Sequence, residues 1–318
     1  LMKKILITGG CGFIGSALVK KLVKDGNKVK VLDNCSRGSA SRLKNILDNI
    51  EFIQGDIRDF DVVSKACEDI EHIHHLAYIN GTENFYKKPE LVLDVAASGI
   101  INLYNCCKEK NIEEFYLAST SEVYQTPLKF PASENERLII PDIMNPRYSY
   151  GGGKILCELV AINCIQKLVN KLVIYRPHNV YGADMGNEHV IPQFFIKMKK
   201  LIKEFGHNKV IDFPIQGSGD ETRSFIHIND FIKAVEILTL KGENNQIYHI
   251  GNSDEISIKK LAMEISEALN INIKIKPGDL QPGSTKRRCP DIKKISDIGY
   301  RQTISLKEGI SSLKGWYY

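Results

Sequence analysis

Tyr150 and Lys154 stand four residues apart in the sequence, with three glycines between them. Residues at this spacing share one face of a helix, so the phenol and the ammonium are expected to lie side by side. A free tyrosine has a pKa of about 10 and is a poor base at neutral pH, but a neighbouring positive charge favours the phenolate. We therefore predict that Tyr150 accepts a proton from a substrate hydroxyl while Lys154 supplies the charge.

The glycines at 151–153 are a second signal at the same place. Glycine inside a helix costs roughly 1 kcal/mol relative to alanine, so stability alone would not select three of them. We attribute them to the close approach of a cofactor or a substrate. Taken alone, the tyrosine and lysine would fit an ordinary surface pair, and the neighbouring motifs favour the chemical interpretation.

Polar residues follow a predicted buried strand at Glu114 to Ala118. Thr120 and Glu122 belong to the run Ser119-Thr120-Ser121-Glu122-Val123-Tyr124. Open α/β sheets bind ligands at the carboxyl ends of their strands, so these side chains are expected to face a cleft. Glu122 is either a further acid or base or a structural residue. The predicted catalytic set is Tyr150, Lys154, Thr120 and Glu122.

Glycines three residues apart occupy the turn after a short apolar strand, in the run Gly9-Gly10-Cys11-Gly12-Phe13-Ile14-Gly15. Such a turn lets the backbone approach a pyrophosphate, whose charge is met by N–H groups and the positive end of the following helix. Asp33 ends the second strand, where a carboxylate accepts hydrogen bonds from the adenine ribose. Because that carboxylate would repel a 2′-phosphate, we predict NAD as the cofactor, with Arg37 leaving NADP open.

The elements that position these residues alternate between strands and helices. Strands are predicted at Lys3 to Thr8, Lys28 to Leu32, Glu51 to Ile53, His72 to Leu76, Glu114 to Ala118 and Lys171 to Tyr175. Helices are predicted at Phe13 to Lys24 and near 60–68, 89–109 and 150–168. This alternation indicates an α/β fold with a doubly wound parallel sheet covered by helices on both faces.

Proline and glycine become frequent after about residue 178, which favours a smaller α/β domain for the remainder. We predict a first domain over residues 1–178, with 224–251 packing back on it. The second domain is predicted over 179–318.

Composition excludes several classes of protein. The net charge of +5 is spread along the chain rather than gathered in a basic block, so a nucleic-acid partner is not expected. The apolar start is too short for a secretory or membrane segment, and the eight cysteines form no CxxC pair and show no metal-ligand spacing with histidine. We expect a cytoplasmic protein without a metal and with reduced thiols.

Together these motifs resemble the extended short-chain dehydrogenase/reductases, namely the NAD-dependent nucleotide-sugar epimerases, 4,6-dehydratases and decarboxylases on a Rossmann-type fold. The resemblance covers nearly the whole chain. It further rests on Gly55-Asp56-Ile57-Arg58-Asp59, His75-Leu76-Ala77 and Arg176-Pro177-His178-Asn179-Val180-Tyr181-Gly182. Two residues depart from the family pattern: Gln125 stands where glycine is usual, and Ala96 where many members carry asparagine.

The resemblance implies a role for each matching position. Asp56 and Ile57 are expected by the adenine, Leu76 and Ala77 along the cofactor cleft, Lys154 also on the nicotinamide ribose, and Thr120 on the sugar O4. The expected cofactor-binding set is Gly9, Gly12, Phe13, Ile14, Gly15, Asp33, Asn34, Ser36, Asp56, Ile57, Leu76, Ala77, Tyr150 and Lys154.

The substrate side is expected to use Thr120, Asn179, Val190, Arg223 and Arg288. The resemblance places Asn179 near the diphosphate and Arg223 and Arg288 on the nucleotide phosphates. Arginine suits this task because its planar fork meets two phosphate oxygens at once.

The implied reaction is oxidation of the sugar C4 hydroxyl to a transient ketone, followed by epimerisation or 4,6-dehydration. A UDP-glucuronate-type decarboxylase, an NADP-dependent keto-sugar reductase and a non-catalytic NAD-binding protein are the alternatives. Ser121 stands where glucose-type dehydratases carry aspartate, whereas Glu122 matches dehydratases and decarboxylases. Apolar residues on several faces of helices 91–108 and 150–168 would suit a homodimer, and core packing explains them equally well.

Overall fold

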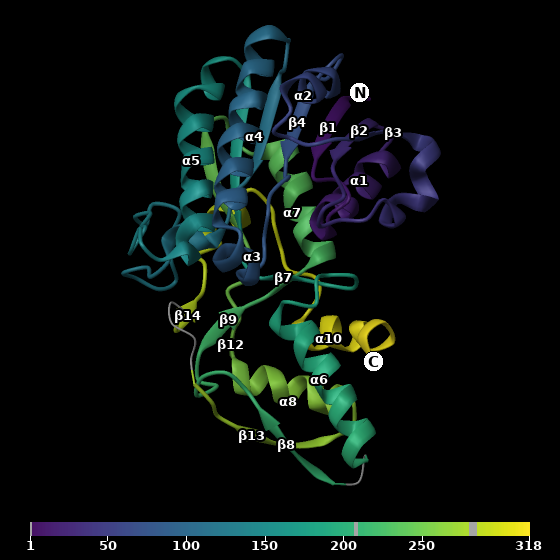
Figure 1. The fold of residues 1–318 in the computed structure, drawn as a ribbon, viewed down its shortest axis with the longest axis vertical. Helices are drawn as coiled ribbons and strands as arrows, with labels where there is room; N and C mark the ends of the chain where they lie inside the picture. The colour runs from purple at the N-terminus through teal and green to yellow at the C-terminus, as the bar shows by residue number, and fades with distance from the viewer. Residues whose placement is uncertain (1, 207–208, 280–284) are drawn as a thin grey trace. The chain divides into compact units, whose positions relative to one another are not determined.

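The computed structural model describes residues 2–206, 209–279 and 285–318 (Figure 1). The chain divides into two compact units, each built from several segments. The first comprises Leu1–Gln125, Arg137–Pro177 and Ile232–His249. The second comprises Thr126–Glu136, His178–Phe231 and Ile250–Tyr318.

A seven-stranded sheet forms the centre of the first unit, in the order β11-β6-β5-β4-β1-β2-β3. Its strands are β1 (Lys4–Thr8), β2 (Lys28–Asp33), β3 (Ile50–Gln54), β4 (His72–His75), β5 (Glu114–Ala118), β6 (Lys171–Pro177) and β11 (Gln246–Ile250). Neighbouring strands from β3 through β6 pair in parallel. Ile5 to Thr8 are all buried, as expected for a strand covered on both faces.

Helices cover both faces of this sheet, so the predicted doubly wound parallel architecture is confirmed. The helices α2 (Phe60–Ala66), α4 (Pro89–Glu109) and α5 (Ser149–Asn163) pack side by side over one face. An ion pair between Lys21 and Glu236, 2.8 Å long, joins α1 (Phe13–Lys24) to α7 (Ile228–Lys241).

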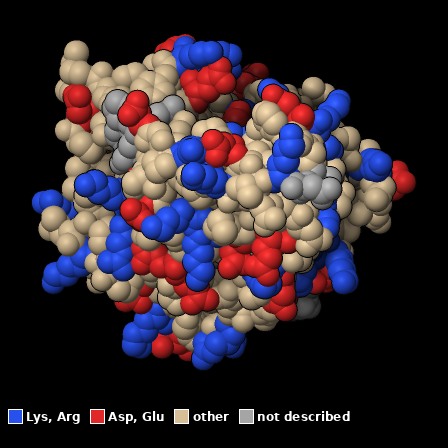
Figure 2. Space-filling view, turned by 90° about the horizontal axis from the view of Figure 1, so that it is seen from below, with Lys and Arg blue, Asp and Glu red and all other residues tan. Residues whose placement is uncertain are grey.

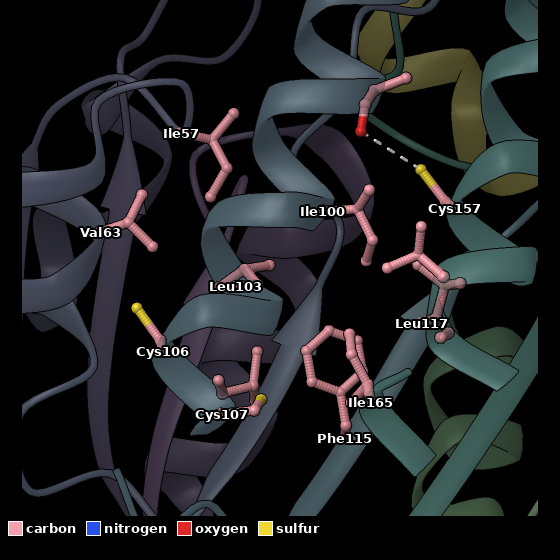
Figure 3. Close-up of a cluster of buried hydrophobic side chains, with 14 of the residues drawn as sticks. Ile57, Val63, Ile100, Leu103, Cys106, Cys107, Phe115, Leu117, Cys157 and Ile165 are labelled. Atoms are coloured by element: carbon pink, nitrogen blue, oxygen red, sulfur yellow. Dashed lines mark hydrogen bonds between the residues drawn. The ribbon is translucent and has the colours of Figure 1, made fainter. Parts of the chain in front are cut away.

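The main apolar core lies between the sheet and α2, α4 and α5 (Figure 3). Phe115 and Leu117 of β5 face Ile100 and Leu103 of α4 there, and all four are fully buried. Cys157 of α5 donates a hydrogen bond to the Ala96 carbonyl at 3.6 Å, the dashed contact of Figure 3. This packing holds α4 and α5 against the sheet.

The second unit is α/β as predicted, with short strands in small sheets. Strand β9 (Thr222–Ser224) lies between β12 (Glu255–Ser257) and β14 (Arg287–Arg288), while β8 (Val210–Pro214) pairs with β13 (Asn272–Lys276), and β7 (Val180–Tyr181) with β10 (Ile226–His227). The helices are α6 (Val190–Phe205), α8 (Ile258–Ala268), α9 (Lys293–Asp297) and α10 (Leu306–Tyr317). On the face that Figure 2 displays, acidic and basic side chains are interspersed.

Some details differ from the sequence expectations. Residues 126–136, which we included in the first domain, belong to the second unit because Ala132 accepts from Asp291 N–H and donates to the Cys289 carbonyl. Residues 224–231 also belong to the second unit. A 3-10 segment at Ala40–Asn49 and the helix α3 (Thr82–Lys87) were not predicted, since neither shows an extended apolar period.

Candidate active site

The glycines between β1 and α1 have distinct tasks. Gly9 has a φ of +76°, and a Cβ there would lie 2.7 Å from the Ala77 nitrogen. A Cβ on Gly15 would lie 2.1 Å from the Gly9 carbonyl oxygen, so Gly15 permits α1 to start against the turn. Gly12 is the most open of the three, with 3.3 Å to its nearest neighbour, and it faces a pocket. The turn therefore leaves backbone exposed at the positive end of α1.

A pocket beside this turn gathers most of the predicted cofactor residues. Its lining includes Gly9, Gly12, Asp33, Asn34, Ser36, Asp56, Ile57, Leu76 and Ala77, together with Arg37, Tyr78 and Val95. Phe13, Ile14 and Gly15 form the first turn of α1 instead of the lining. Tyr150 and Lys154 are also absent from the lining, although both contact Tyr78, which belongs to it.

Hydrogen bonds fix the two carboxylates of this pocket. Asp33 accepts from the backbone N–H of Cys11 at 2.8 Å and of Cys35 at 2.7 Å, and a carboxylate retains further acceptor sites. Asp56 accepts from Arg58 Nε at 2.9 Å and from Asn34 Nδ2 at 3.1 Å. The hydrogen bond from Arg58 is the largest cause that lowers the pKa of Asp56 to about 2. Both carboxylates are thus held in fixed positions on the pocket wall.

Tyr150 is the second residue of α5 and is 9% exposed. Its ring stacks on Phe85 of α3, with centroids 4.8 Å apart, and meets the edge of Tyr78 at 5.2 Å. Two aromatic rings therefore fix the orientation of the phenol. Sequence reasoning missed both, because they come from the unpredicted segment after β4.

Lys154 lies one turn along the same helix and is 3% exposed. Its Nζ donates to the Ala118 carbonyl at 2.7 Å and lies 4.0 Å from the centroid of the Tyr78 ring. Burial lowers the pKa of Lys154 from 10.5 to about 8, because the surroundings disfavour the charged form. Tyr78 thus contacts the ring of Tyr150 and the ammonium of Lys154 at once.

Thr120 and Glu122 share the 3-10 turn that follows β5. The hydroxyl of Thr120 accepts the Glu122 N–H at 3.2 Å and caps this turn, Ser121–Tyr124. The Glu122 carboxylate lies 3.7 Å from Arg147, and both side chains are mostly buried. This ion pair was not anticipated from the sequence.

Behind the turn lies a buried polar network that the sequence did not reveal. Glu158 of α5 forms a two-pronged ion pair with Arg176, at 2.9 and 2.5 Å, and both side chains are at most 3% exposed. Ser119 donates to the same carboxylate, and Arg176 also contacts Tyr124. The network ties α5 to the ends of β5 and β6, and so fixes the residues that flank Thr120.

The glycines of α5 make room for protein groups, which corrects our attribution to a cofactor or substrate. A Cβ on Gly153 would lie 2.1 Å from the Tyr78 hydroxyl and 2.9 Å from Ala96 Cβ. A Cβ on Gly151 would lie 2.9 Å from Gln125 Nε2, which donates to the Glu122 carbonyl at 2.6 Å. The two departures from the family pattern, Gln125 and Ala96, therefore pack against these glycines.

The remaining predicted substrate residues belong to the second unit. Arg223 and Arg288 are register partners on the adjacent strands β9 and β14, so the structure brings these two together. Arg223 donates to the Thr285 carbonyl at 2.7 Å, and Asn179 donates to the Ser224 carbonyl at 2.8 Å. Val190 is the first residue of α6, an element separate from this sheet.

Comparison with known proteins now identifies the family. A model described as the NAD dependent epimerase/dehydratase family matches residues 5–251. This chain belongs to that family. It is an enzyme, and NAD is its cofactor, which confirms both predictions.

Its relatives span more than one reaction. The chain is 32% identical to a putative UDP-glucose 4-epimerase of Methanocaldococcus jannaschii, covering 98% of this chain and 97% of that protein. It is 30% identical to UDP-glucuronic acid decarboxylase 3 of Arabidopsis thaliana, covering 96% and 86%. A solved UDP-N-acetylglucosamine 4-epimerase from Methanobrevibacter ruminantium, in complex with UDP-N-acetylmuramic acid, matches with a TM-score of 0.87 and 26% identity over 99% and 98% of the two chains.

The pocket fits the dinucleotide that the family uses. Gly12 leaves open backbone at the start of α1, where a pyrophosphate binds, and Asp33 places a carboxylate on the same wall for a ribose. Among the described helices, none combines the length and apolar composition needed to cross a bilayer.

Proposed function

We propose that this enzyme is a nucleotide-sugar 4-epimerase in which Tyr150 takes the proton of the sugar C4 hydroxyl. The observation that carries the proposal is the contact of one ring, Tyr78, with both Tyr150 and the buried ammonium of Lys154. A positive charge held there favours the phenolate that the reaction needs. NAD, when bound, supplies the acceptor for the C4 hydride.

Each of the other predicted site residues then has a defined task. Thr120 hydrogen-bonds O4 of the sugar from the turn at the end of β5, and Lys154 also holds the nicotinamide ribose. Arg223 and Arg288 bind the diphosphate, which is supported by their pairing on adjacent strands. Asn179 and Val190 complete the substrate side. The resulting 4-keto sugar turns its other face toward the site. Return of the hydride to that face of C4, with return of the Tyr150 proton to O4, would give the C4 epimer.

Glu122 favours a second candidate, a 4,6-dehydratase, because its carboxylate lies on the same turn as Thr120. In that reaction the C4 ketone acidifies the C5 proton, a carboxylate accepts it, and the C6 hydroxyl takes up a proton and leaves as water. The hydride removed from C4 would then be returned to C6 and a proton to C5, which gives the 4-keto-6-deoxy sugar. The ion pair with Arg147 supports the epimerase instead, since it engages this carboxylate elsewhere.

Product analysis separates these reactions. The purified protein is incubated with UDP-, dTDP-, GDP- and CDP-hexoses and with UDP-glucuronate, and the sugar protons are followed by NMR. We expect UDP-glucose and its C4 epimer to reach one mixture from either side, with Glu122→Gln retaining most of the rate. A 4-keto-6-deoxy product that vanishes in Glu122→Gln would establish the dehydratase, and a pentose product the decarboxylase. Failure to convert any of these substrates contradicts the proposal.

We also propose that two copies associate through α4 and α5. Leu93 and Ile101 on α4 are 46% and 43% exposed, and Leu159 on α5 is 54% exposed. Two such helix pairs bury these residues in a four-helix contact with two-fold symmetry. Light scattering is expected to give a dimer that Leu159→Lys dissociates and that Leu240→Lys, at a 74% exposed position on α7, leaves intact. The eight free thiols support a cytoplasmic location.

A further inference from the structure

Two cysteines flank the Asp33 carboxylate at the cofactor pocket. The sulfurs of Cys11 and Cys35 and one Asp33 oxygen lie within 4.8 Å of one another. Cys11 belongs to the glycine turn after β1, and Cys35 follows β2. The backbone N–H groups of both donate to Asp33, at 2.8 and 2.7 Å, so the carboxylate holds the two cysteines in this arrangement.

The two thiols differ in their access to solvent. Cys11 is fully buried, whereas Cys35 is partly exposed. Cys35 also has a φ of +57°, a left-handed conformation that non-glycine residues seldom adopt. A small oxidant therefore reaches Cys35 first and finds a second thiol beside it.

We propose that Cys11 and Cys35 form a reversible disulfide in response to hydroperoxides, and that this disulfide weakens the binding of NAD. In the first step the Cys35 thiolate attacks hydrogen peroxide and displaces hydroxide, giving a sulfenic acid. In the second step the Cys11 sulfur attacks the Cys35 sulfur, and the hydroxyl leaves as water with the Cys11 proton. Two thiols and one peroxide thus give one disulfide and two waters.

The link to NAD follows from the position of Cys35 between two residues that line the pocket, and it rests on the proposed cofactor site. Asn34 and Ser36, on either side of Cys35, both line the pocket. A disulfide requires a sulfur–sulfur distance of about 2.05 Å, so bond formation draws residues 34–36 toward the glycine turn. The glycine turn already packs tightly against Gly38, where a Cβ would lie 2.4 Å from the Cys11 carbonyl oxygen, so the turn itself cannot move far. The displacement therefore falls on the residues that face NAD.

A second thiol pair provides an internal control. Cys67 and Cys106 lie within hydrogen-bonding contact of each other, and both are fully buried in the apolar core. Figure 3 labels Cys106, on α4. In both pairs the two thiols lie close together, but only the pair of Cys11 and Cys35 has a thiol that solvent reaches. Cys164 supplies the opposite control, since it is another partly exposed thiol.

The experiment oxidises the reduced protein with one equivalent of hydrogen peroxide and maps its tryptic peptides after alkylation. Cys11 and Cys35 fall in the separate peptides 5–20 and 31–37. We expect these two peptides to be linked with the loss of two hydrogens, no link between Cys67 and Cys106, and reversal by dithiothreitol. Calorimetry is expected to give an NAD dissociation constant raised by about ten-fold or more in the oxidised protein.

Matched variants test whether the disulfide between Cys11 and Cys35 causes the loss of NAD affinity. Cys35→Ser is expected to bind NAD as the reduced protein does and to lose the response to peroxide, whereas Cys164→Ser and Cys67→Ser keep it. Absence of the linked peptide, an unchanged NAD affinity in the linked protein, or an equal loss of affinity in oxidised Cys35→Ser each overturns the proposal. A reduced protein that binds no NAD refutes the cofactor site and the coupling, while the peptide map still reports on the thiol pair.

Discussion

Two buried charges lie one helical turn apart on α5, and they are stabilised in opposite ways. Lys154 keeps its ammonium against a carbonyl and an aromatic face, and its pKa is lowered to about 8. Glu158 meets the guanidinium of Arg176 in a two-pronged ion pair, and its neighbours Ser119 and Tyr124 add further hydrogen bonds to the pair. Among the residues that the structure describes, no carboxylate lies at contact distance from the Lys154 ammonium, whereas Glu158 has a guanidinium at contact distance.

We infer from this difference that the Lys154 charge influences the reacting groups, whereas the charges of Glu158 and Arg176 hold α5 in place. The Glu158 carboxylate is neutralised at contact distance by Arg176, so this pair serves mainly to fix α5 against the strand ends. Lys154 retains a field that a neighbouring phenol can feel, and the protein bears the cost of burying it. The contrast predicts that function and stability respond differently to changes at the two places.

The largest expected effect concerns the phenol that the uncompensated charge serves. Tyr150→Phe removes only the proton acceptor and keeps the stacking on Phe85, so turnover is expected to fall by about 10²–10⁴-fold. NAD affinity and the unfolding midpoint should stay near those of the unchanged protein. Steady-state rates with the substrate found by NMR, together with calorimetry, check this. Turnover within a few-fold of the original would remove Tyr150 from the mechanism.

The compensated pair is tested by removing one partner. Arg176→Met leaves the Glu158 carboxylate buried without its guanidinium, and the free energy of unfolding is expected to fall by about 3–5 kcal/mol. Arg287 forms the matched exposed pair with Glu255 at 2.8 Å, and Arg287→Met should cost less than about 1 kcal/mol. Urea unfolding measures both. Equal losses would show that burial does not distinguish these pairs.

Lys154→Met is expected to lower turnover while raising stability, because it deletes an uncompensated buried charge. Below pH 8 the ammonium is charged in both folded and unfolded chains, and the folded protein bears the desolvation cost. The variant should therefore gain on the order of 1–3 kcal/mol at pH 7, less the lost hydrogen bond to Ala118. Above the unfolded pKa of 10.5 the lysine is neutral in both states, so this gain should disappear between pH 8 and 10.5. A variant less stable than the original at pH 7 would show that the ammonium is well solvated by its two contacts.

The sequence could predict the pair of Tyr150 and Lys154, but it could not predict the ion pair of Glu158 and Arg176. The spacing of Tyr150 and Lys154 is local, and β5 and α4 were predicted with their observed bounds because buried strands and long apolar helices have clear periods. Arg176 ends a strand, where a charged residue is usually solvated, and no local pattern pairs it with a glutamate on α5. Long-range side-chain pairing leaves no period in the sequence.

The same limit applies to the pocket. The glycine turn and Asp33 follow from spacing, whereas the meeting of Cys11 with Cys35 depends on how two loops pack across a strand edge. Tyr78 follows β4 with no periodic signal, although its ring contacts both predicted catalytic residues of α5, Tyr150 and Lys154. Tyr78 also explains why residue 153 is a glycine, which we had attributed to the approach of a ligand.

That glycine gives the smallest expected effect and a direct test of how Tyr78 is seated. Gly153→Ala places a methyl group 2.1 Å from the Tyr78 hydroxyl, so the Tyr78 side chain must shift, at an expected cost of about 1–3 kcal/mol in unfolding free energy. Tyr78→Phe removes the hydroxyl and should restore most of that loss in the double variant, because the next ring atom lies 3.5 Å away. Gly315→Ala, in α10 with open space around it, is the control and should not destabilise. If Gly153→Ala lowers the unfolding free energy by the same amount when phenylalanine stands at position 78, the obstruction comes from Ala96. The contrast between Lys154 and Glu158 would then depend on the packing of α4 against α5, and not on the Tyr78 ring.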